Sequence, residues 1–160
     1  PEPKYVNRKV SIGNITGNYI DSGAKHFVIN IGSSFPSKNI LKDIAKKIRF
    51  NKSLFPNGIN INFYKIIDKE TIKVITYEKG IEDIVESCAS GSFACAYHLC
   101  KKMNFLKDIT VLNNGGKLFI KFNKNFSENS ITAKAKIEKE YFIDIPNWVH
   151  LIIKNITLKF

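Results

Sequence analysis

The segment that follows Cys88 constrains the fold of this chain more than any other part of the sequence. Three small residues, Ala89, Ser90 and Gly91, come directly after the thiol, and an almost continuously apolar stretch comes next. Its apolar side chains are Phe93, Ala94, Ala96, Tyr97, Leu99 and Cys100. A helix that is hydrophobic on nearly all sides is stable only when other elements cover it. We therefore expect a largely buried helix that starts at the thiol and runs over about 91–104.

Most of the remaining chain is strand-like, because apolar and polar side chains alternate with a period of two. The expected strands cover 5–12, 15–20, 26–31, 59–66, 71–77, 109–112, 117–122, 130–137 and 141–145, with one more in the tail from 148 to 160. The Gly13-Asn14 pair and the Asn-Asn-Gly-Gly run at 113–116 are typical of hairpin turns. Each joins two of these strands.

One further helix interrupts the strands. After Ser37, a good N-cap residue, apolar side chains recur at helical spacing, which predicts an amphipathic helix over 38–50. They are Ile40, Leu41, Ile44, Ala45 and Ile48. A chain of 160 residues with 44% hydrophobic residues can form one domain with its own core. We expect an α+β fold over residues 1–160, with antiparallel strands wrapped around the central apolar helix.

Cys88 is the strongest candidate for chemistry. Unpaired backbone N–H groups at the start of a helix attract anions, and the positive end of the helix dipole lowers the pKa of a cysteine placed there. The small residues after the thiol would let a ligand approach the backbone closely. The alternative is a small buried cysteine before an ordinary helix, since free cysteine is among the most often buried residues.

The other two cysteines, Cys95 and Cys100, lie in the same segment as Cys88. An odd number of crowded cysteines argues against a disulfide framework, and a reducing cytoplasm suits such a chain. Cys95 and His98 are three residues apart, the spacing of one helical face, and with Cys100 they could supply zinc ligands. No second pair of ligands follows them in the sequence, so we expect no bound metal.

The net charge of +11 raises nucleic acid as a partner. Almost all of the positive charge is scattered lysine, however, and arginine occurs only at Arg8 and Arg49. Arginine has the planar group that recognises phosphates and bases best. A solvated surface therefore explains the charge better than nucleic-acid binding does. No apolar run approaches the ~20 residues of a membrane-spanning helix, so no membrane partner is expected.

Five short motifs along the chain occur in a recognisable order. They are Gly23-Ala24-Lys25-His26-Phe27-Val28, Asn60-Ile61-Asn62-Phe63, Tyr77-Glu78-Lys79-Gly80, Cys88-Ala89-Ser90-Gly91 and Gly115-Gly116-Lys117-Leu118. In this order the motifs resemble the C-terminal half of the diaminopimelate epimerase family. The resemblance spans roughly residues 5–145, and the cysteine motif is its most specific part.

The resemblance implies a cofactor-independent amino-acid epimerase or racemase that acts on a small amino-acid substrate. In this family two cysteines face opposite sides of the substrate α-carbon. One thiolate removes the α-proton, and the other thiol returns a proton on the other side. The resemblance also implies that strands enclose the helix and that a similar N-terminal domain, absent from this sequence, lies across the active-site cleft. Family members often pair as homodimers.

The resemblance assigns catalytic roles to three residues. Cys88 corresponds to the acid/base thiol of this half, and Glu78 corresponds to the carboxylate that manages its proton. His26 corresponds to the histidine that partners the thiol of the other half. Taken without the resemblance, Glu78 is also consistent with a surface carboxylate at a strand end, and His26 with a histidine satisfied within a strand.

Substrate contacts are expected from Asn60 and Lys79 and from the backbone at Ala89 and Ser90. A carbanion beside a carboxylate is stabilised by N–H donors aimed at the developing enolate oxygens, and the backbone of Ala89 and Ser90 could provide them. The alternative for Asn60 is an edge-strand amide that contacts no ligand.

The sequence departs from the family pattern around this site. Ala24 stands where the family has an asparagine, Lys79 where it has an arginine, and Ala89 where it has a glycine. One extra residue precedes the cysteine, and Glu82-Asp83 replaces a glycine-glutamate pair. Lysine cannot clamp a carboxylate in the bidentate manner of arginine. These changes leave open a racemase of another amino acid, or a ligand-binding domain that has lost catalysis.

Neither of the other two cysteines can stand in for a second catalytic thiol. Cys95 lies seven residues beyond Cys88, which is roughly 10 Å along a helix. It therefore cannot face the opposite side of the same carbon, and neither can Cys100. We expect that the 160-residue chain on its own does not racemise an amino acid.

Overall fold

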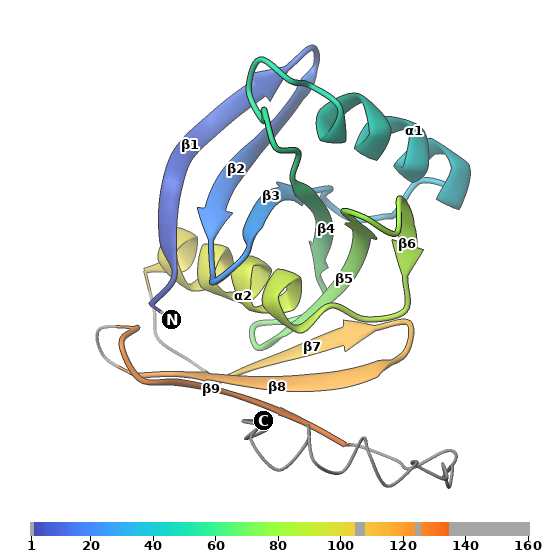
Figure 1. The fold of residues 1–160 in the computed structure, drawn as a ribbon. Coiled ribbons are helices and arrows are strands. Elements are labelled where there is room, and N and C mark those ends of the chain that lie inside the picture. The colour runs from blue at the N-terminus through green and yellow to red at the C-terminus, as the bar shows by residue number, and fades with distance from the viewer. Residues whose placement is uncertain (1, 105–107, 124–125, 135–160) are drawn as a thin grey trace, which may run out of the picture.

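The computed structural model describes residues 2–104, 108–123 and 126–134 (Figure 1). Within these residues, nine strands form one sheet and two helices pack against it. The strands are β1 (Lys4–Ile12), β2 (Ile15–Asp21), β3 (Lys25–Asn30), β4 (Asn60–Ile66), β5 (Thr71–Glu78), β6 (Asp83–Val85), β7 (Ile109–Asn113), β8 (Gly116–Phe122) and β9 (Asn129–Ala133). The helices are α1 (Lys38–Arg49) and α2 (Ala89–Met103).

The sheet is mixed. Its strands follow the order β1-β2-β3-β4-β5-β7-β8-β9, and β6 pairs with β5 beside this path. Most neighbours are antiparallel, but β3 pairs parallel with β4, and β5 pairs parallel with β7. The prediction of a purely antiparallel sheet is therefore wrong at these two places. The reason is that α1 connects β3 to β4 and α2 lies between β5 and β7, and a helical crossover returns the chain in the same direction.

Helix α1 forms where the sequence predicts it. Ser37 is its N-cap, and the Ser37 side-chain oxygen accepts a hydrogen bond from the N–H of Ile40 (3.5 Å). The helix ends at Arg49, one residue earlier than expected, with Phe50 as its C-cap. Its buried apolar side chains are Leu41, Ala45 and Ile48. This apolar stripe covers one face of the sheet.

Alternation along the central strands gives the sheet two apolar faces. In β3, Phe27 and Ile29 belong to the core around α1, whereas Val28 between them belongs to the core around α2. In β4, Phe63 and Tyr64 divide in the same way. Successive side chains of a strand point to opposite faces, so each central strand serves both helices.

Helix α2 is buried over most of its length, as its apolar sequence predicts. Nine of its fifteen residues are buried, and it contacts β3, β4, β5, β7 and β8. In Figure 1 it lies between the β1–β5 part of the sheet and the β7–β9 part. In the described part of the chain, neither helix has the length and apolar character of a membrane span.

The element boundaries test several predictions. Helix α2 begins directly after Cys88, and the 113–116 turn joins β7 to β8, as expected. Strand β6 was not predicted, because its acidic start is typical of a connecting segment. The strand expected over 130–137 corresponds to β9, which ends at 133. The strands expected over 141–145 and 148–160 lie outside the described residues.

Candidate active site

Three polar residues of the central strands face α2 and lie close together. His26 is in β3, Asn62 in β4 and Thr76 in β5, and Asn62 is paired directly with Thr76 in the sheet. His26 is paired with Asn60, two residues before Asn62 on the same face of β4. The side chains of His26, Asn62 and Thr76 are at most 1% exposed. Polar groups buried to this extent are stable only when they are hydrogen-bonded.

A chain of hydrogen bonds satisfies these side chains and leads to the thiol. Nδ2 of Asn62 donates to Oγ1 of Thr76 (2.7 Å), and Oδ1 of Asn62 lies 2.8 Å from Nδ1 of His26. Nε2 of His26 lies 3.1 Å from Oγ of Ser90, in the first turn of α2. That hydroxyl oxygen lies 3.5 Å from Sγ of Cys88. One serine hydroxyl thus connects the thiol to a buried histidine.

The start of α2 holds the thiol in place. Cys88 is the N-cap, with an extended backbone (φ −143°, ψ 110°), and its C=O accepts the first hydrogen bond of the helix. Oγ of Ser22 donates to the C=O of Ser90 (3.0 Å), which ties this turn to the connection between β2 and β3. Gly91 packs so closely on Asn62 that a Cβ at position 91 would overlap Nδ2 of the amide. The absence of a side chain at Gly91 therefore lets α2 pack closely on the hydrogen-bonded side chains of the central strands.

The structure raises the pKa of the Cys88 thiol above its ordinary value. Burial is the main cause, and the negative charge of Glu78 adds to it. Hydrogen bonding with the Ser90 hydroxyl and with the N–H of Gly91 opposes the shift without cancelling it. The prediction that the helix start lowers this pKa is wrong in this structure, because burial and a neighbouring carboxylate outweigh the hydrogen bonds that the thiol makes at the helix start. At neutral pH, Cys88 is a protonated thiol that can donate its proton.

Glu78 ends β5 and acts electrostatically on this thiol. Its Oε2 atom is buried and has no hydrogen-bond partner within the described part of the chain. A buried carboxylate oxygen without a donor is costly. The negative charge of this carboxylate acts on the Cys88 thiol, whose pKa it raises.

Burial lowers the pKa of His26, although its hydrogen bond with Asn62 and the charge of Asp21 act in the opposite direction. The ring is therefore neutral at pH 7, with one N–H and one free lone pair. The resemblance assigns His26 to the thiol of the other half. In this structure, His26 is joined to Cys88 through the hydroxyl of Ser90.

The residues expected to contact a substrate differ in their surroundings. Asn60 is only 7% exposed, and its Oδ1 accepts a hydrogen bond from the backbone N–H of Lys79 (2.8 Å). Asn60 therefore secures the end of β5 next to Glu78. Lys79 and Ala89 are exposed, and Ser90 is half-buried. Their roles in substrate binding stay predictions.

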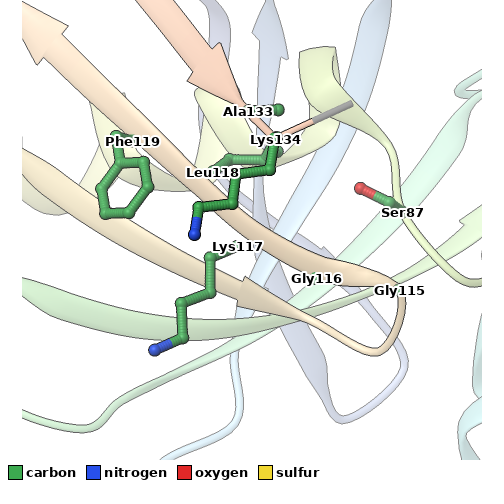
Figure 2. A pocket seen from close by; sticks show the side chains of 8 residues that line it. All are labelled: Ser87, Gly115, Gly116, Lys117, Leu118, Phe119, Ala133 and Lys134. Atoms are coloured by element: carbon green, nitrogen blue, oxygen red, sulfur yellow. The ribbon is translucent and has the colours of Figure 1, made fainter. Parts of the chain in front are cut away.

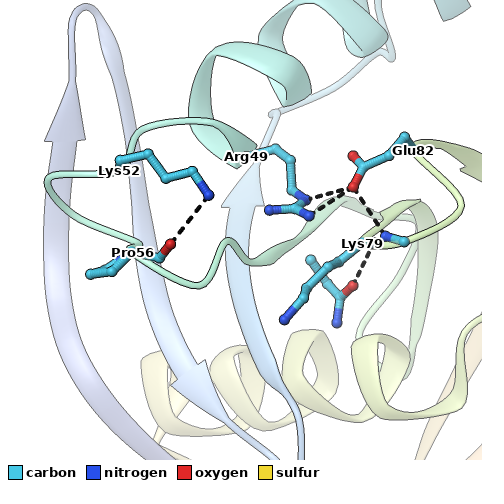
Figure 3. A network of polar contacts seen from close by, with 7 residues as sticks. Arg49, Lys52, Pro56, Lys79 and Glu82 are labelled. Carbon is cyan, nitrogen blue, oxygen red and sulfur yellow. Dashed lines mark hydrogen bonds and ion pairs between the residues drawn. The ribbon is translucent and has the colours of Figure 1, made fainter.

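An ion pair holds the loop that follows Glu78. Oε1 of Glu82 accepts hydrogen bonds from Nε (3.1 Å) and Nη2 (2.7 Å) of Arg49 and from the N–H of Gly80 (3.1 Å) (Figure 3). Glu82 has a φ of 56°, a left-handed conformation that is uncommon for residues other than glycine. Arg49 is 8% exposed and comes from the end of α1. Helix α1 therefore anchors the loop beside the candidate site.

A pocket of about 600 Å³ opens beside Ser87, the residue before the thiol. The β7–β8 hairpin lines it with Gly115 and Gly116, and the side chains of Lys117 and Lys134 extend along it (Figure 2). The two ammonium groups give this pocket a positive character.

Cys95 and Cys100 are buried in α2. His98, on the same helix, makes other contacts: Nδ1 lies 2.7 Å from Oη of Tyr5, and Nε2 lies 3.5 Å from Nδ2 of Asn18. Among residues 2–104, 108–123 and 126–134, no three His, Cys, Asp or Glu side chains are grouped as a metal site.

The family model of diaminopimelate epimerase matches residues 18–138 of this chain. The match includes the strands that carry His26 and Glu78 and the helix that Cys88 begins. The chain belongs to the diaminopimelate epimerase family. The family resemblance of the short motifs is thereby confirmed.

Relatives named diaminopimelate epimerase match most of the chain. The protein of Aquifex aeolicus (strain VF5) is 33% identical over 123 residues, which are 76% of this chain and 43% of that protein. The protein of Hydrogenobaculum sp. (strain Y04AAS1) is 29% identical over 133 residues, which are 81% of this chain and 48% of that protein. The chain thus spans a little under half the length of these diaminopimelate epimerases.

Solved structures share the fold at low sequence identity. A probable proline racemase from Agrobacterium radiobacter K84 has a TM-score of 0.59 at 13% identity, covering 81% of this chain and 46% of that chain. A hydroxyproline epimerase from Agrobacterium vitis has a TM-score of 0.57 at 10% identity, covering 81% of this chain and 45% of that chain. These likenesses show that this member of the diaminopimelate epimerase family shares its fold with them.

The sequence did not identify several residues of this site. Asn62 could have been identified, because it lies two residues after Asn60 and therefore on the same face of β4. Thr76 could not, since threonine is common in strands. The pairing of Arg49 with Glu82 joins residues 33 positions apart, so no local pattern could predict it.

Proposed function

We propose that this chain supplies one half of the active site of an epimerase that inverts the α-carbon of diaminopimelate, in the synthesis of lysine and peptidoglycan precursors. The observation that carries the proposal is the position of Cys88. Its thiol stands at the start of α2, under the influence of Glu78, in a chain of the diaminopimelate epimerase family.

In the proposed reaction, Cys88 exchanges the α-proton on one face of the substrate. Glu78 manages the proton of this thiol, and the backbone N–H groups of Ala89 and Ser90 stabilise the enolate oxygens that develop beside the carbanion. A second cysteine, in a further domain, acts on the opposite face. The chain covers under half of its relatives' length, which supports a second domain. No step requires a cofactor.

The proposal has a structural part. Residues 1–160 form one domain in which strands enclose α2. The contacts of α2 with β3, β4, β5, β7 and β8 support this arrangement.

The test is hydrogen exchange at the α-carbon of diaminopimelate in deuterated water. In the complete protein we expect exchange with inversion, and the change Cys88→Ala should reduce turnover by roughly 10²–10⁴-fold, because the proton-transfer group is removed. Cys100→Ala is the matched control, since Cys100 is buried in the same helix, far from its start. Unchanged turnover of the Cys88→Ala protein would contradict the proposal.

The second candidate is a racemase of a different amino acid on the same scaffold. It is favoured by Ala24 and Lys79, which replace the asparagine and the arginine of the family pattern. A panel of amino acids in the same exchange assay separates the two, since exchange of another amino acid without exchange of diaminopimelate favours this candidate. Calorimetric binding without any exchange would instead indicate a ligand-binding domain.

A further inference from the structure

The hydroxyl of Ser90 lies between the thiol and the buried histidine. Its oxygen is 3.5 Å from Sγ of Cys88 and 3.1 Å from Nε2 of His26. The proposed function uses only the backbone of Ser90 and leaves this hydroxyl without a role. Its position between a proton donor and a neutral imidazole calls for one.

The direction of the hydrogen bond between Ser90 and His26 follows from the side chains at the other end of this series of hydrogen bonds, Asn62 and Thr76. Nδ2 of Asn62 donates to Oγ1 of Thr76, so the carbonyl oxygen of the amide faces Nδ1 of His26. An amide oxygen only accepts hydrogen bonds, so Nδ1 carries the ring proton and Nε2 presents the lone pair. The Ser90 hydroxyl therefore donates to Nε2, and its oxygen is free to accept a proton from the Cys88 thiol.

We propose that Ser90 relays a proton between the Cys88 thiol and His26. This inference rests on the proposed function, in which Cys88 exchanges a proton with the substrate. The S–H bond of Cys88 breaks as an O–H bond forms on Ser90, and the original O–H bond of Ser90 breaks as an N–H bond forms at Nε2 of His26. The products are a thiolate and an imidazolium, and the net charge is unchanged. The reverse transfer restores the thiol.

The surrounding charges make this route useful. The charge of Glu78, in β5, raises the pKa of Cys88, and Cys88 in turn raises the pKa of Cys95, in α2. The charge of Asp21, in β2, favours the protonated form of His26. An ionised Glu78 opposes a thiolate at Cys88, whereas an imidazolium formed at His26 stabilises it. The Asn62 carbonyl then accepts from a charged ring, which strengthens that hydrogen bond.

The relay also answers a need of two-base chemistry. When one cysteine takes a proton from the substrate and the other gives one, each turnover exchanges their protonation states. The free enzyme must redistribute these protons before it acts again in the same direction. A histidine connected to Cys88 through one hydroxyl offers a route that does not require the substrate.

The test is a double-mutant cycle on thiol reactivity in the complete protein. Iodoacetamide alkylation of Cys88, located by mass spectrometry, reports its thiolate as a function of pH. We expect Ser90→Ala to slow alkylation at pH 7 about tenfold, the change that one pKa unit produces. His26→Gln should slow it similarly when Ser90 is present and should add nothing in the Ser90→Ala protein. Ser90→Thr keeps the hydroxyl and should keep the response to His26→Gln.

Additive effects of Ser90→Ala and His26→Gln, or an unchanged alkylation profile in Ser90→Ala, would overturn the relay. These outcomes are distinguishable from failure of the proposed function, which is decided by turnover of the Cys88→Ala protein. Loss of turnover in Cys88→Ala together with additive alkylation effects would leave the epimerase standing and reject the relay. Circular dichroism of each variant identifies any that does not fold, and Ser90→Thr then carries the comparison.

Discussion

Replacing Gly91 with alanine places a methyl group inside the space of the Asn62 side chain. The new Cβ would overlap Nδ2 of Asn62 and lie 3.0 Å from its Cγ. Asn62 is fully buried and is fixed by hydrogen bonds to His26 and Thr76, so it cannot move without breaking one of them. The substitution therefore disturbs the series of hydrogen bonds that leads from Asn62 to the Cys88 thiol, and not the helix alone.

The magnitude follows from three contributions. Overpacking a close contact costs about 1–3 kcal/mol, and a buried amide left without its partner costs about 1–3 kcal/mol. Alanine in a helix regains up to about 1 kcal/mol over glycine. At the middle of these ranges, Gly91→Ala should lower the free energy of unfolding by about 3 kcal/mol. For a chain of this size, the thermal midpoint should then fall by roughly 6–12 °C.

The assay is thermal and urea unfolding of four proteins: the natural sequence, Gly91→Ala, Asn62→Ala and the double variant. Removing the Asn62 side chain empties the space that the new methyl group needs. In the Asn62→Ala background, Gly91→Ala should therefore be neutral or stabilising by up to about 1 kcal/mol, from helix propensity. An equal cost of Gly91→Ala in both backgrounds would refute the reasoning, because the penalty could not then come from contact with Asn62.

Two further predictions concern groups away from the thiol. Arg49→Met should lower the free energy of unfolding in urea by about 1–2 kcal/mol. This loss is smaller than for a fully buried ion pair, because the Glu82 side chain is about a third exposed. Glu82→Gln is the matched variant. Burial, Lys102 and Arg8 lower the pKa of His98 from 6.5 to about 4. The unfolded chain therefore takes up this proton first, so stability should fall by up to about 3 kcal/mol as pH drops from 6.5 to 4, and His98→Gln should flatten that slope.

Each of these has a result that would count against it. A free energy of unfolding that Arg49→Met leaves unchanged within about 0.5 kcal/mol would show that the ion pair does not anchor the loop after Glu78.

Burial by itself would raise the pKa of Glu82, but the N–H of Gly80 and the guanidinium of Arg49 lower it on balance. The pair should therefore weaken only as pH falls below the ordinary carboxylate range. For His98, equal slopes in the natural and His98→Gln proteins would show that other groups set the acid response.

Much of the local structure could be predicted from the sequence. The spacing of apolar residues after Ser37 and after Cys88 predicted both helices within a few residues, and the Asn-Asn-Gly-Gly run predicted the β7–β8 turn. These features depend on side chains close together in the chain, so their patterns are visible in the sequence. The placement of a cysteine at the start of a buried helix is a feature of the same kind.

The site could be predicted only in part, because its contacts join distant strands. His26 and Cys88 were identified as candidates, but their connection through Ser90 depends on the packing of α2 against β3, which local alternation does not reveal. The sign of the pKa shift at Cys88 was also wrong. It depends on burial and on the charge of Glu78, and both follow from tertiary packing.

Within residues 2–104, 108–123 and 126–134, the sequence by itself determined the elements: two helices, most of the strands, and a thiol at a helix start followed by small residues. It determined them because helix and strand periodicities, capping and turns involve neighbouring residues. Tertiary structure decided which strands run parallel, which polar side chains meet beneath α2, and whether the thiol keeps its proton. Those outcomes depend on burial and on contacts between residues far apart in the chain, and these arise only when the sheet packs against both helices.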